Sequence, residues 1–279
     1  MNVTIGPRPD PAEALERLRD TLAGVPVRVI ACSGGIDSLL LALVAHRMSS
    51  DDTLVAHTLT PAVPSDGTER VEEYADREGW RLEIVRSREF DDERYLSNPT
   101  DRCYHCKRNL YDAVGELRSR VGDDAVILSG ANVDDLGEYR PGLVAAAERS
   151  VRHPYVEAGI TKSEIRAIAR HLGVVHADLP ASPCLASRLY TGTRVTPSRL
   201  RAVEAGEAVV RRHSGIDVVR CRIDGDHVRV EVTEADRPRI DRSILAAVAQ
   251  TMQTIEPGIV DVVLDGEPYR PGRAVAVEA

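Results

Sequence analysis

Short runs of β-branched and apolar residues alternate with longer helical patterns over the first two thirds of the chain. The strand-like runs cover 27–32, 53–59, 81–85 and 125–129, and helical patterns cover 11–23, 36–44, 67–79 and 103–121. This rhythm predicts an α/β fold, a doubly wound parallel sheet with helices on both faces. Ligands of such sheets bind at the carboxyl ends of the strands, so the loops after Cys32 and Leu59 are candidate neighbours of one ligand.

Local capping signals place several helix boundaries. Thr161 and Glu164 have the spacing of a capping box, and Gly173 is expected to end the helix that they open. Thr196, followed by proline, is the expected N-cap of a helix that runs to about residue 213.

The last third of the chain has a different pattern. Two alternating runs, 218–223 and 228–232, flank Asp224-Gly225-Asp226, which is a strong hairpin signal. A helical pattern over 236–253 and a strand-like run over 259–264 complete a small α+β domain. We therefore expect a first domain over 1–190 and a second, substrate-binding or oligomerisation domain over 191–279.

The stretch 33–38, Ser-Gly-Gly-Ile-Asp-Ser, lies between the first strand and an apolar helix. Glycines there allow a tight turn, and a helix N-terminus can hold phosphate groups. No lysine follows the glycines, so this is not the loop that ends in Gly-Lys-Ser/Thr. An ordinary glycine-rich turn is the alternative. The pattern resembles the PP-loop of ATP pyrophosphatases, which cleave ATP between its α and β phosphates.

Composition narrows the class of protein. The chain has 279 residues, 43% of them hydrophobic, which is ordinary for a globular protein of two modest domains. A net charge of −8 disfavours a general nucleic-acid binder, although a local basic groove remains open. No signal peptide or membrane-length apolar run is seen, and the five cysteines are an odd number. These features predict a cytoplasmic protein with metal or thiol chemistry and no disulfide framework.

Three of the cysteines are candidates for that chemistry. Cys103 and Cys106 start a predicted helix and share one side of it, and Cys184 lies in an aperiodic segment. Three thiolates suit a 4Fe–4S cluster with one iron open to a small ligand. A zinc knuckle and a redox dithiol are the alternatives. Cys32 and Cys221 lie inside strand patterns and are expected in the core.

Several polar groups lie near the expected sites. Asn132, Asp134 and Asp135 follow the fourth strand, as ligand-binding groups or as caps. Two paired sets complete the candidates: Arg220 and Arg222 on one strand face, and Glu204 and Glu207 on one helix side. The arginines could bind carboxylate or phosphate, with a solvated sheet face as the alternative. The glutamates could bind a metal or an arginine, although their spacing alone favours a solvated helix face.

Four motifs together resemble the LarE family of ATP-dependent sulfur transferases, which act in nickel-pincer nucleotide cofactor synthesis. The motifs are 33–38, 98–107 (Asn-Pro-Thr-Asp-Arg-Cys-Tyr-His-Cys-Lys), 130–142 and 183–188 (Pro-Cys-Leu-Ala-Ser-Arg). The resemblance implies that ATP adenylylates a carboxylate of pyridinium-3,5-biscarboxylate mononucleotide with release of pyrophosphate. Sulfur then displaces AMP and leaves a thiocarboxylate.

The resemblance also implies roles for residues. Arg220 and Arg222 would bind substrate, and Asp37 with Glu204 or Glu207 would bind Mg²⁺; Glu231 would match a further acidic residue of the family. The ATP-binding candidates are Ser33, Gly34, Gly35, Asp37, Ser38, His57, Asn132, Asp134, Asp135 and Arg188. Some members sacrifice the sulfur of the cysteine matching Cys184, whereas three-cysteine members are thought to relay sulfide on a 4Fe–4S cluster. Because Cys103, Cys106 and Cys184 are all present, the cluster type is expected, with an external sulfur donor and a homohexameric assembly.

Three other functions are weighed against this one. A PP-loop tRNA thiolase would need a basic RNA surface, which the acidic balance disfavours. An ammonia-using ligase such as NAD synthetase has no need of three thiols. A non-catalytic nucleotide-binding protein with a zinc knuckle would hold zinc without iron or sulfide and release no pyrophosphate.

Overall fold

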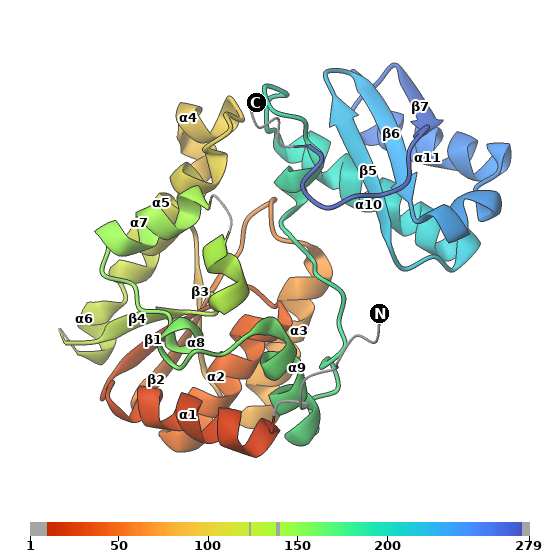
Figure 1. Ribbon diagram of the computed structural model, residues 1–279. Coiled ribbons are helices and arrows are strands. Elements are labelled where there is room, and N and C mark those ends of the chain that lie inside the picture. Colours follow the sequence, from red (N-terminus) through yellow and green to blue (C-terminus); the bar gives the residue numbers. More distant parts are fainter. Residues whose placement is uncertain (1–9, 123, 138–139, 275–279) are drawn as a thin grey trace. The chain divides into compact units, whose positions relative to one another are not determined.

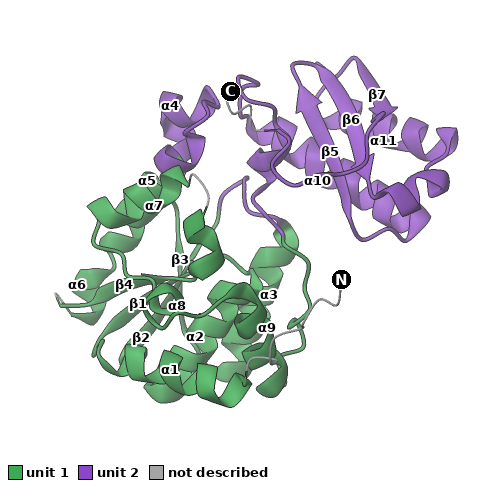
Figure 2. Ribbon diagram, viewed as in Figure 1, with its two compact units in different colours: residues 1–59, 65–88, 106–181 green, residues 60–64, 89–105, 182–279 purple. Residues whose placement is uncertain are grey.

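The structure is a computed structural model that describes residues 10–122, 124–137 and 140–274. The chain divides into two compact units, shown in different colours in Figure 2. Unit 1 comprises 1–59, 65–88 and 106–181, and unit 2 comprises 60–64, 89–105 and 182–279. The sequence places a boundary at residue 190, whereas the contacts divide the chain after residue 181. The contacts also assign the earlier segments 60–64 and 89–105 to unit 2. A single boundary along the chain cannot describe this division.

Unit 1 is built on a parallel sheet, as expected for an α/β fold (Figure 1). Its strands within the described residues are β1 (Arg28–Cys32), β2 (Thr53–Thr58), β3 (Arg81–Val85) and β4 (Val126–Ser129). They lie in the order β3-β2-β1-β4, and all three pairings are parallel. The chain therefore leaves β1 toward one edge and later returns to its other side, so the topological switch point lies between β1 and β4.

Helices cover both faces of this sheet. One apolar cluster joins Ile30, Val55 and Leu128 to residues of α1 (Pro11–Ala23), α2 (Ile36–Met48), α3 (Ser65–Glu78), α8 (Pro154–Glu157) and α9 (Lys162–His171). The other joins Val29 and Ile127 to residues of α5 (Arg102–Gly115) and α7 (Pro141–Glu148). Successive strand residues point to opposite faces, which is why neighbours such as Val29 and Ile30 enter different clusters.

Helix α2 is buried on nearly all sides. Every residue from Ser38 to Ala45 is buried, and Ile36 is buried as well. A helix with no polar face must be enclosed by other elements. The helix following the glycine-rich loop is therefore held as part of the core, and its first turn has a fixed position.

The predicted helix over 103–121 is interrupted. Helix α5 ends at Gly115, and a separate short helix, α6, covers Arg118–Val121. Glycine is a poor helix former, and Leu117 N–H bonds to the carbonyl of Val114 where the helix breaks. The capping box of Thr161 and Glu164 is confirmed, with both reciprocal hydrogen bonds present.

Unit 2 contains a mixed sheet in the order β5-β6-β7, formed by Val219–Asp224, His227–Val232 and Asp261–Leu264. The predicted hairpin is confirmed: β5 and β6 are antiparallel, and Gly225 in the turn has a φ of 62°. Strand β7 pairs with β6 in parallel. Helices α10 (Pro197–Ser214) and α11 (Arg242–Ile255) belong to this unit, as does the short α4 (Glu93–Leu96).

The helix predicted over 236–253 begins later than expected. Glu234–Arg239 is a 3₁₀ segment that contains Pro238, and α11 begins at Arg242 with Asp241 as its N-cap. Proline lacks the N–H that a helix interior needs, so the regular helix starts only beyond it. Further 3₁₀ segments cover Glu89–Asp91, Val133–Gly137 and Leu185–Arg188.

None of the helices in the described part of the chain combines the length and the apolar character needed to cross a lipid bilayer.

Candidate functional site

The glycine-rich loop lies at the switch point of the unit 1 sheet, between β1 and α2. Gly34 has a φ of 79°, and a Cβ there would lie 2.1 Å from the carbonyl oxygen of Gly67. On the β4 side, a Cβ on Gly130 would lie 2.9 Å from the amide nitrogen of Ser38. The main chain of the loop and the start of α2 are therefore packed against the first turn of α3 and the turn after β4, with no space for a side chain at either contact.

Ser33 and Ser38 hold the loop closed. The Ser38 hydroxyl accepts from Ser33 N–H at 3.0 Å and lies 3.0 Å from the Gly35 carbonyl, to which it donates. The first N–H groups of α2 have no partner within their own helix, as in every α-helix. Together with the positive end of the helix dipole, they form a site suited to an anion at the switch point.

Asp37, in the first turn of α2, is the charged group of this site. Its carboxylate forms an ion pair with Lys162, and the two side chains are 24% and 33% exposed. Asn132 Nδ2 lies 3.5 Å from the same carboxylate, and the Tyr155 hydroxyl donates to the Asp37 carbonyl at 2.9 Å. Burial raises the pKa of Asp37, and Lys162 opposes that rise. The structure thus brings Asp37 and Asn132 together.

Lys162 is a site residue that the sequence analysis did not single out. It is one of only two lysines in the chain, and it occupies the first position of α9, after the capping Thr161. Its main-chain N–H donates to Asp134 at 2.6 Å while its side chain reaches Asp37. The scarcity of lysine in the chain could have drawn attention to Lys162. Nothing in the local sequence, however, indicates that it contacts Asp37, which lies 125 positions earlier.

Asp134 and Asp135 mainly organise the loop after β4. Asp135 accepts from the Asn132 N–H at 3.0 Å and pairs with Arg140 at 3.0 Å. Asp134 N–H in turn donates to the Asn132 side chain at 3.1 Å. These contacts fix Asn132, which is 3% exposed, beside Asp37.

His57 and Arg70 brace the loop from the β2 side. His57 is fully buried, with Nδ1 2.8 Å from the Cys32 carbonyl and Nε2 2.9 Å from the Thr68 hydroxyl. Burial lowers the pKa of His57, so a neutral ring that donates to Cys32 and accepts from Thr68 satisfies both contacts. Arg70, a second residue that the sequence analysis missed, donates from Nε to the Gly34 carbonyl at 3.0 Å.

In unit 2, Arg188 and Glu207 form a buried ion pair. Arg188 Nε lies 2.9 Å from one Glu207 oxygen and Nη2 lies 3.2 Å from the other, and both side chains are 2% exposed. Burial alone would lower the pKa of Arg188, but the Glu207 carboxylate keeps it above its ordinary value. Glu204, three residues earlier on α10, is only partly buried.

A second buried ion pair joins the two strands of the hairpin. Arg222 Nε lies 2.6 Å from Glu231, which also pairs with Arg273 at 3.2 Å. The guanidinium of Arg220 lies over the ring of Tyr269, and burial lowers its pKa. Arg220 and Arg222 thus both lie in the buried, charged part of unit 2.

The five cysteines, all within the described ranges, are thiols and not disulfides. Cys103 is exposed and Cys106 half-buried near the start of α5, and Cys184 is half-buried just before the 3₁₀ segment Leu185–Arg188. Cys32 and Cys221 are buried, as predicted, and burial raises the pKa of Cys32 to about 11. Among the described residues, no three His, Cys, Asp or Glu side chains gather in a metal-binding group.

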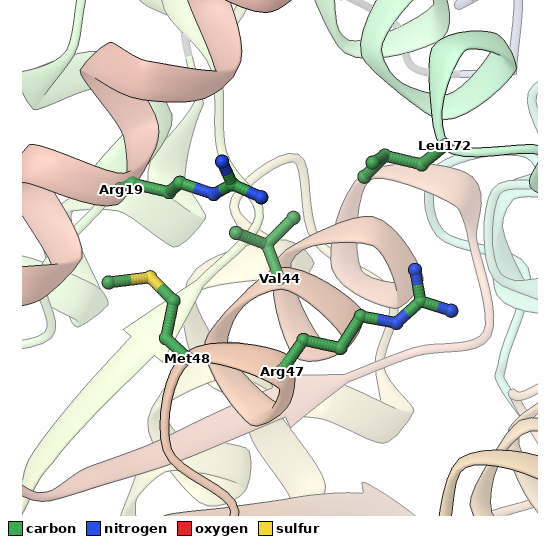
Figure 3. A pocket seen from close by; sticks show the side chains of 5 residues that line it. All are labelled: Arg19, Val44, Arg47, Met48 and Leu172. Atoms are coloured by element: carbon green, nitrogen blue, oxygen red, sulfur yellow. The ribbon is translucent and has the colours of Figure 1, made fainter.

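Unit 1 also has a hollow of about 250 Å³ at the far end of α2 from the glycine-rich loop (Figure 3). It is lined by Arg19, Val44, Arg47, Met48 and Leu172. Arg19 pairs with Glu16 and Arg47 pairs with Glu78, so both cations that border it already have carboxylate partners. The predicted site residues are not among its lining.

Comparison with known proteins gives relatives that match most of this chain, although no family model matches. Protein slr1717 of Synechocystis is 35% identical over 260 residues, covering 93% of this chain and 96% of that protein. The pyridinium-3,5-bisthiocarboxylic acid mononucleotide synthase of Lactiplantibacillus plantarum is 29% identical and covers 88% of this chain and 87% of its own length. One of the subunits of the glutamine-hydrolysing GMP synthase of Methanopyrus kandleri is 26% identical over 71% of this chain and 66% of that protein. The extent of the match to slr1717 shows that this chain and slr1717 belong to one family, and the similarity to the named synthase supports the LarE family as that family.

Proposed function

We propose that this chain is an ATP-dependent sulfurtransferase that converts a carboxylate of pyridinium-3,5-biscarboxylate mononucleotide to a thiocarboxylate. The observation that carries the proposal is the closed glycine-rich loop at the sheet's switch point, with Asp37 and Lys162 at its edge. A loop of this kind is suited to an anion, and it lies in the position where parallel sheets bind nucleotides. The similarity to the named synthase supplies the substrate class.

The first step is adenylylation. A carboxylate oxygen of the substrate attacks the α-phosphorus of ATP, the bond to the bridging oxygen breaks, and pyrophosphate leaves. The N-terminus of α2 would stabilise the departing pyrophosphate, and Lys162 would turn from Asp37 to a phosphate oxygen. Asp37, released from Lys162, would then be available to Mg²⁺, which favours carboxylate ligands beside phosphates.

The remaining ATP-site candidates have supporting roles in this proposal. Ser33, Ser38 and Gly35 shape the loop, His57 braces it, and Asn132 orients the Asp37 carboxylate. Asp134 and Asp135 hold the neighbouring turn. Glu204 and Glu207, both on α10, are the other candidate metal ligands, and Glu207 is engaged by Arg188.

The second step is sulfur transfer. A thiolate attacks the carbonyl carbon of the acyl adenylate, the carbon–oxygen bond breaks, and AMP leaves with the electron pair. If Cys184 attacks, the product is a thioester. Loss of its Cα proton then expels the sulfur as thiocarboxylate and leaves dehydroalanine. Arg220 and Arg222 would bind the anionic groups of the substrate, in the charged interior of unit 2.

The sulfur source expected for a chain with all three cysteines is a 4Fe–4S cluster held by Cys103, Cys106 and Cys184, and sacrifice of Cys184 is the alternative. Such a group, when bound, would supply sulfide repeatedly without consuming a cysteine. Mass spectrometry of the Cys184 peptide after one turnover separates the two sources. Loss of H₂S from that peptide supports sacrifice, whereas an unchanged peptide with bound iron and sulfide in anaerobic protein supports the cluster. We also propose a homo-oligomer, a hexamer by analogy with the family, acting in the cytoplasm.

The function is tested by incubating the protein with ATP, Mg²⁺ and the pyridinium mononucleotide. We expect pyrophosphate and AMP to appear only with the mononucleotide, and the product mass to show exchange of oxygen for sulfur. Asp37→Ala should abolish pyrophosphate release, whereas Asp20→Ala, at an exposed position of α1, should leave it unchanged. Equal pyrophosphate release by wild type and Asp37→Ala would contradict the assignment of the ATP site.

A further inference from the structure

Cys184 lies on a main chain that a buried arginine holds. Arg188 Nη1 donates toward the carbonyl oxygens of Pro183 at 2.7 Å and Cys184 at 3.2 Å, and toward the Ser187 hydroxyl at 3.0 Å. The opposite edge of the same guanidinium, Nε and Nη2, binds Glu207. One planar side chain thus connects the segment that carries the Cys184 thiol to helix α10.

Glu207 is itself anchored from two further directions. Its Oε1 accepts from the Cys221 N–H of β5 at 3.2 Å, and its Oε2 accepts from Arg211 Nη2 at 3.1 Å. Helix α10 can approach β5 this closely because residue 206 is a glycine. A Cβ there would lie 2.7 Å from the sulfur of Met252 and 3.2 Å from that of Cys221.

The donor count at Glu207 argues against a metal role. Each carboxylate oxygen has two lone pairs, and each accepts two hydrogen bonds here: Oε1 from Arg188 and Cys221, Oε2 from Arg188 and Arg211. A cation would have to displace a buried arginine from its carboxylate, and the arginine would then lack a counter-charge.

We propose that Glu207 is a positioning residue for Cys184: it fixes Arg188, and Arg188 fixes the main chain that aims the thiol. This inference rests on the proposed function, because it assumes that Cys184 takes part in sulfur transfer. Misplacing a reacting group by about 1 Å can cost about 100-fold in rate. The ion pair therefore acts on the sulfur step and leaves adenylylation, which belongs to the loop in unit 1, unchanged.

The test compares Glu207→Gln and Arg188→Lys with Arg201→Gln, an exposed position on the same helix α10. Two half-reactions are followed separately: substrate-dependent pyrophosphate release and formation of the thiocarboxylate. For Glu207→Gln we expect thiocarboxylate formation to fall about 100-fold with little change in pyrophosphate release or in the KM of the mononucleotide. Arg188→Lys, which cannot span both sets of partners, should behave in the same way, and Arg201→Gln should match wild type.

A second readout does not depend on turnover. Iodoacetamide labelling of each cysteine is followed by peptide mass spectrometry, with exposed Cys103 as the internal reference. In both variants the rate at Cys184 should rise severalfold relative to Cys103, because its main chain is no longer held. This ratio is measurable even if wild type makes no thiocarboxylate, a result that would contradict the proposed function and not the contact.

Three results would overturn the positioning role. The first is a wild-type labelling ratio in both variants, and the second is an equal loss of both half-reactions. The third is recovery of Glu207→Gln activity at raised Mg²⁺ or Mn²⁺ concentration, which would assign Glu207 to a metal.

Discussion

Two of the ion pairs, each between one acidic and one basic side chain, differ strongly in how far water reaches them. In unit 1, Asp37 and Lys162 meet at a loop edge, and each keeps a quarter to a third of its side chain exposed. In unit 2, Arg188 and Glu207 are joined by two hydrogen bonds and are 2% exposed. Partners at the loop edge can separate to receive a ligand, whereas the sealed pair can only hold its surroundings in place.

The difference follows from solvation. A pair that keeps contact with water gains less from its attraction, since water competes for both ions; for fully exposed pairs a typical contribution is about 0.2–1 kcal/mol. A buried pair has lost its water, so removing one partner leaves an uncompensated charge at a cost of about 3–5 kcal/mol. Substitutions should therefore affect stability in unit 2 and ligand handling in unit 1.

The largest effect is expected at Glu207. Glu207→Ala leaves the Arg188 guanidinium buried without its carboxylate, and we expect the free energy of unfolding to fall by about 3–5 kcal/mol. Urea denaturation followed by circular dichroism measures this, with Arg201→Ala on the same helix as control. If the free energy of unfolding fell by only about 0.2–1 kcal/mol, as for an exposed ion pair, the Arg188–Glu207 pair would not be shielded from water as described.

A smaller effect, on catalysis alone, is expected at Lys162. Lys162→Ala should lower pyrophosphate release about 10- to 100-fold, as expected for the loss of a hydrogen bond between two charged groups. The free energy of unfolding should change by less than about 1 kcal/mol. Arg170→Ala is the matched control, because Arg170 is a cation on the same helix paired with Asp178 at the surface. If Lys162→Ala lowered the free energy of unfolding as much as Glu207→Ala does, the proposed difference between the two ion pairs would be wrong.

The smallest effect concerns pH. Burial raises the pKa of Asp37 in the folded protein, so the folded state binds more protons than the unfolded state between the ordinary pKa of 3.8 and the raised one. The free energy of unfolding therefore falls as pH rises through that window. Asp37→Asn should be more stable than wild type at pH 7, and the difference should disappear below pH 3.8. Thermal unfolding across pH 3–7 checks this. If Asp37→Asn were less stable than wild type at pH 7, the prediction would be wrong.

Much of the fold could be predicted because its signals are local. The capping box at Thr161, the N-cap at Thr196 and the turn at Gly225 each specify a boundary within a few residues. Pro238 is equally local, yet the predicted helix ran through it, and the 3₁₀ segment in its place shows that the proline prevails over the helical pattern.

The site was less predictable because its key contacts join distant segments. The glycine-rich loop was identified from its own residues, but its closure by Gly67 and Gly130 depends on how β4 and α3 pack. Lys162 reaches Asp37 only in the folded chain. From its spacing, Glu207 could bind a metal or an arginine. That it is buried with Arg188 depends on the tertiary structure and cannot be read from the spacing.

The absence of a side chain at Gly130 has a consequence for engineering this protein. In a library that diversifies the turn after β4, any side chain at residue 130 meets the main chain of α2 at 2.9 Å, so that position must stay glycine. Diversity can instead be placed at Val133 and Leu136, which are not buried. Which positions of this turn can be varied thus depends on residue 130, where glycine has a hydrogen atom and even alanine would add a methyl group.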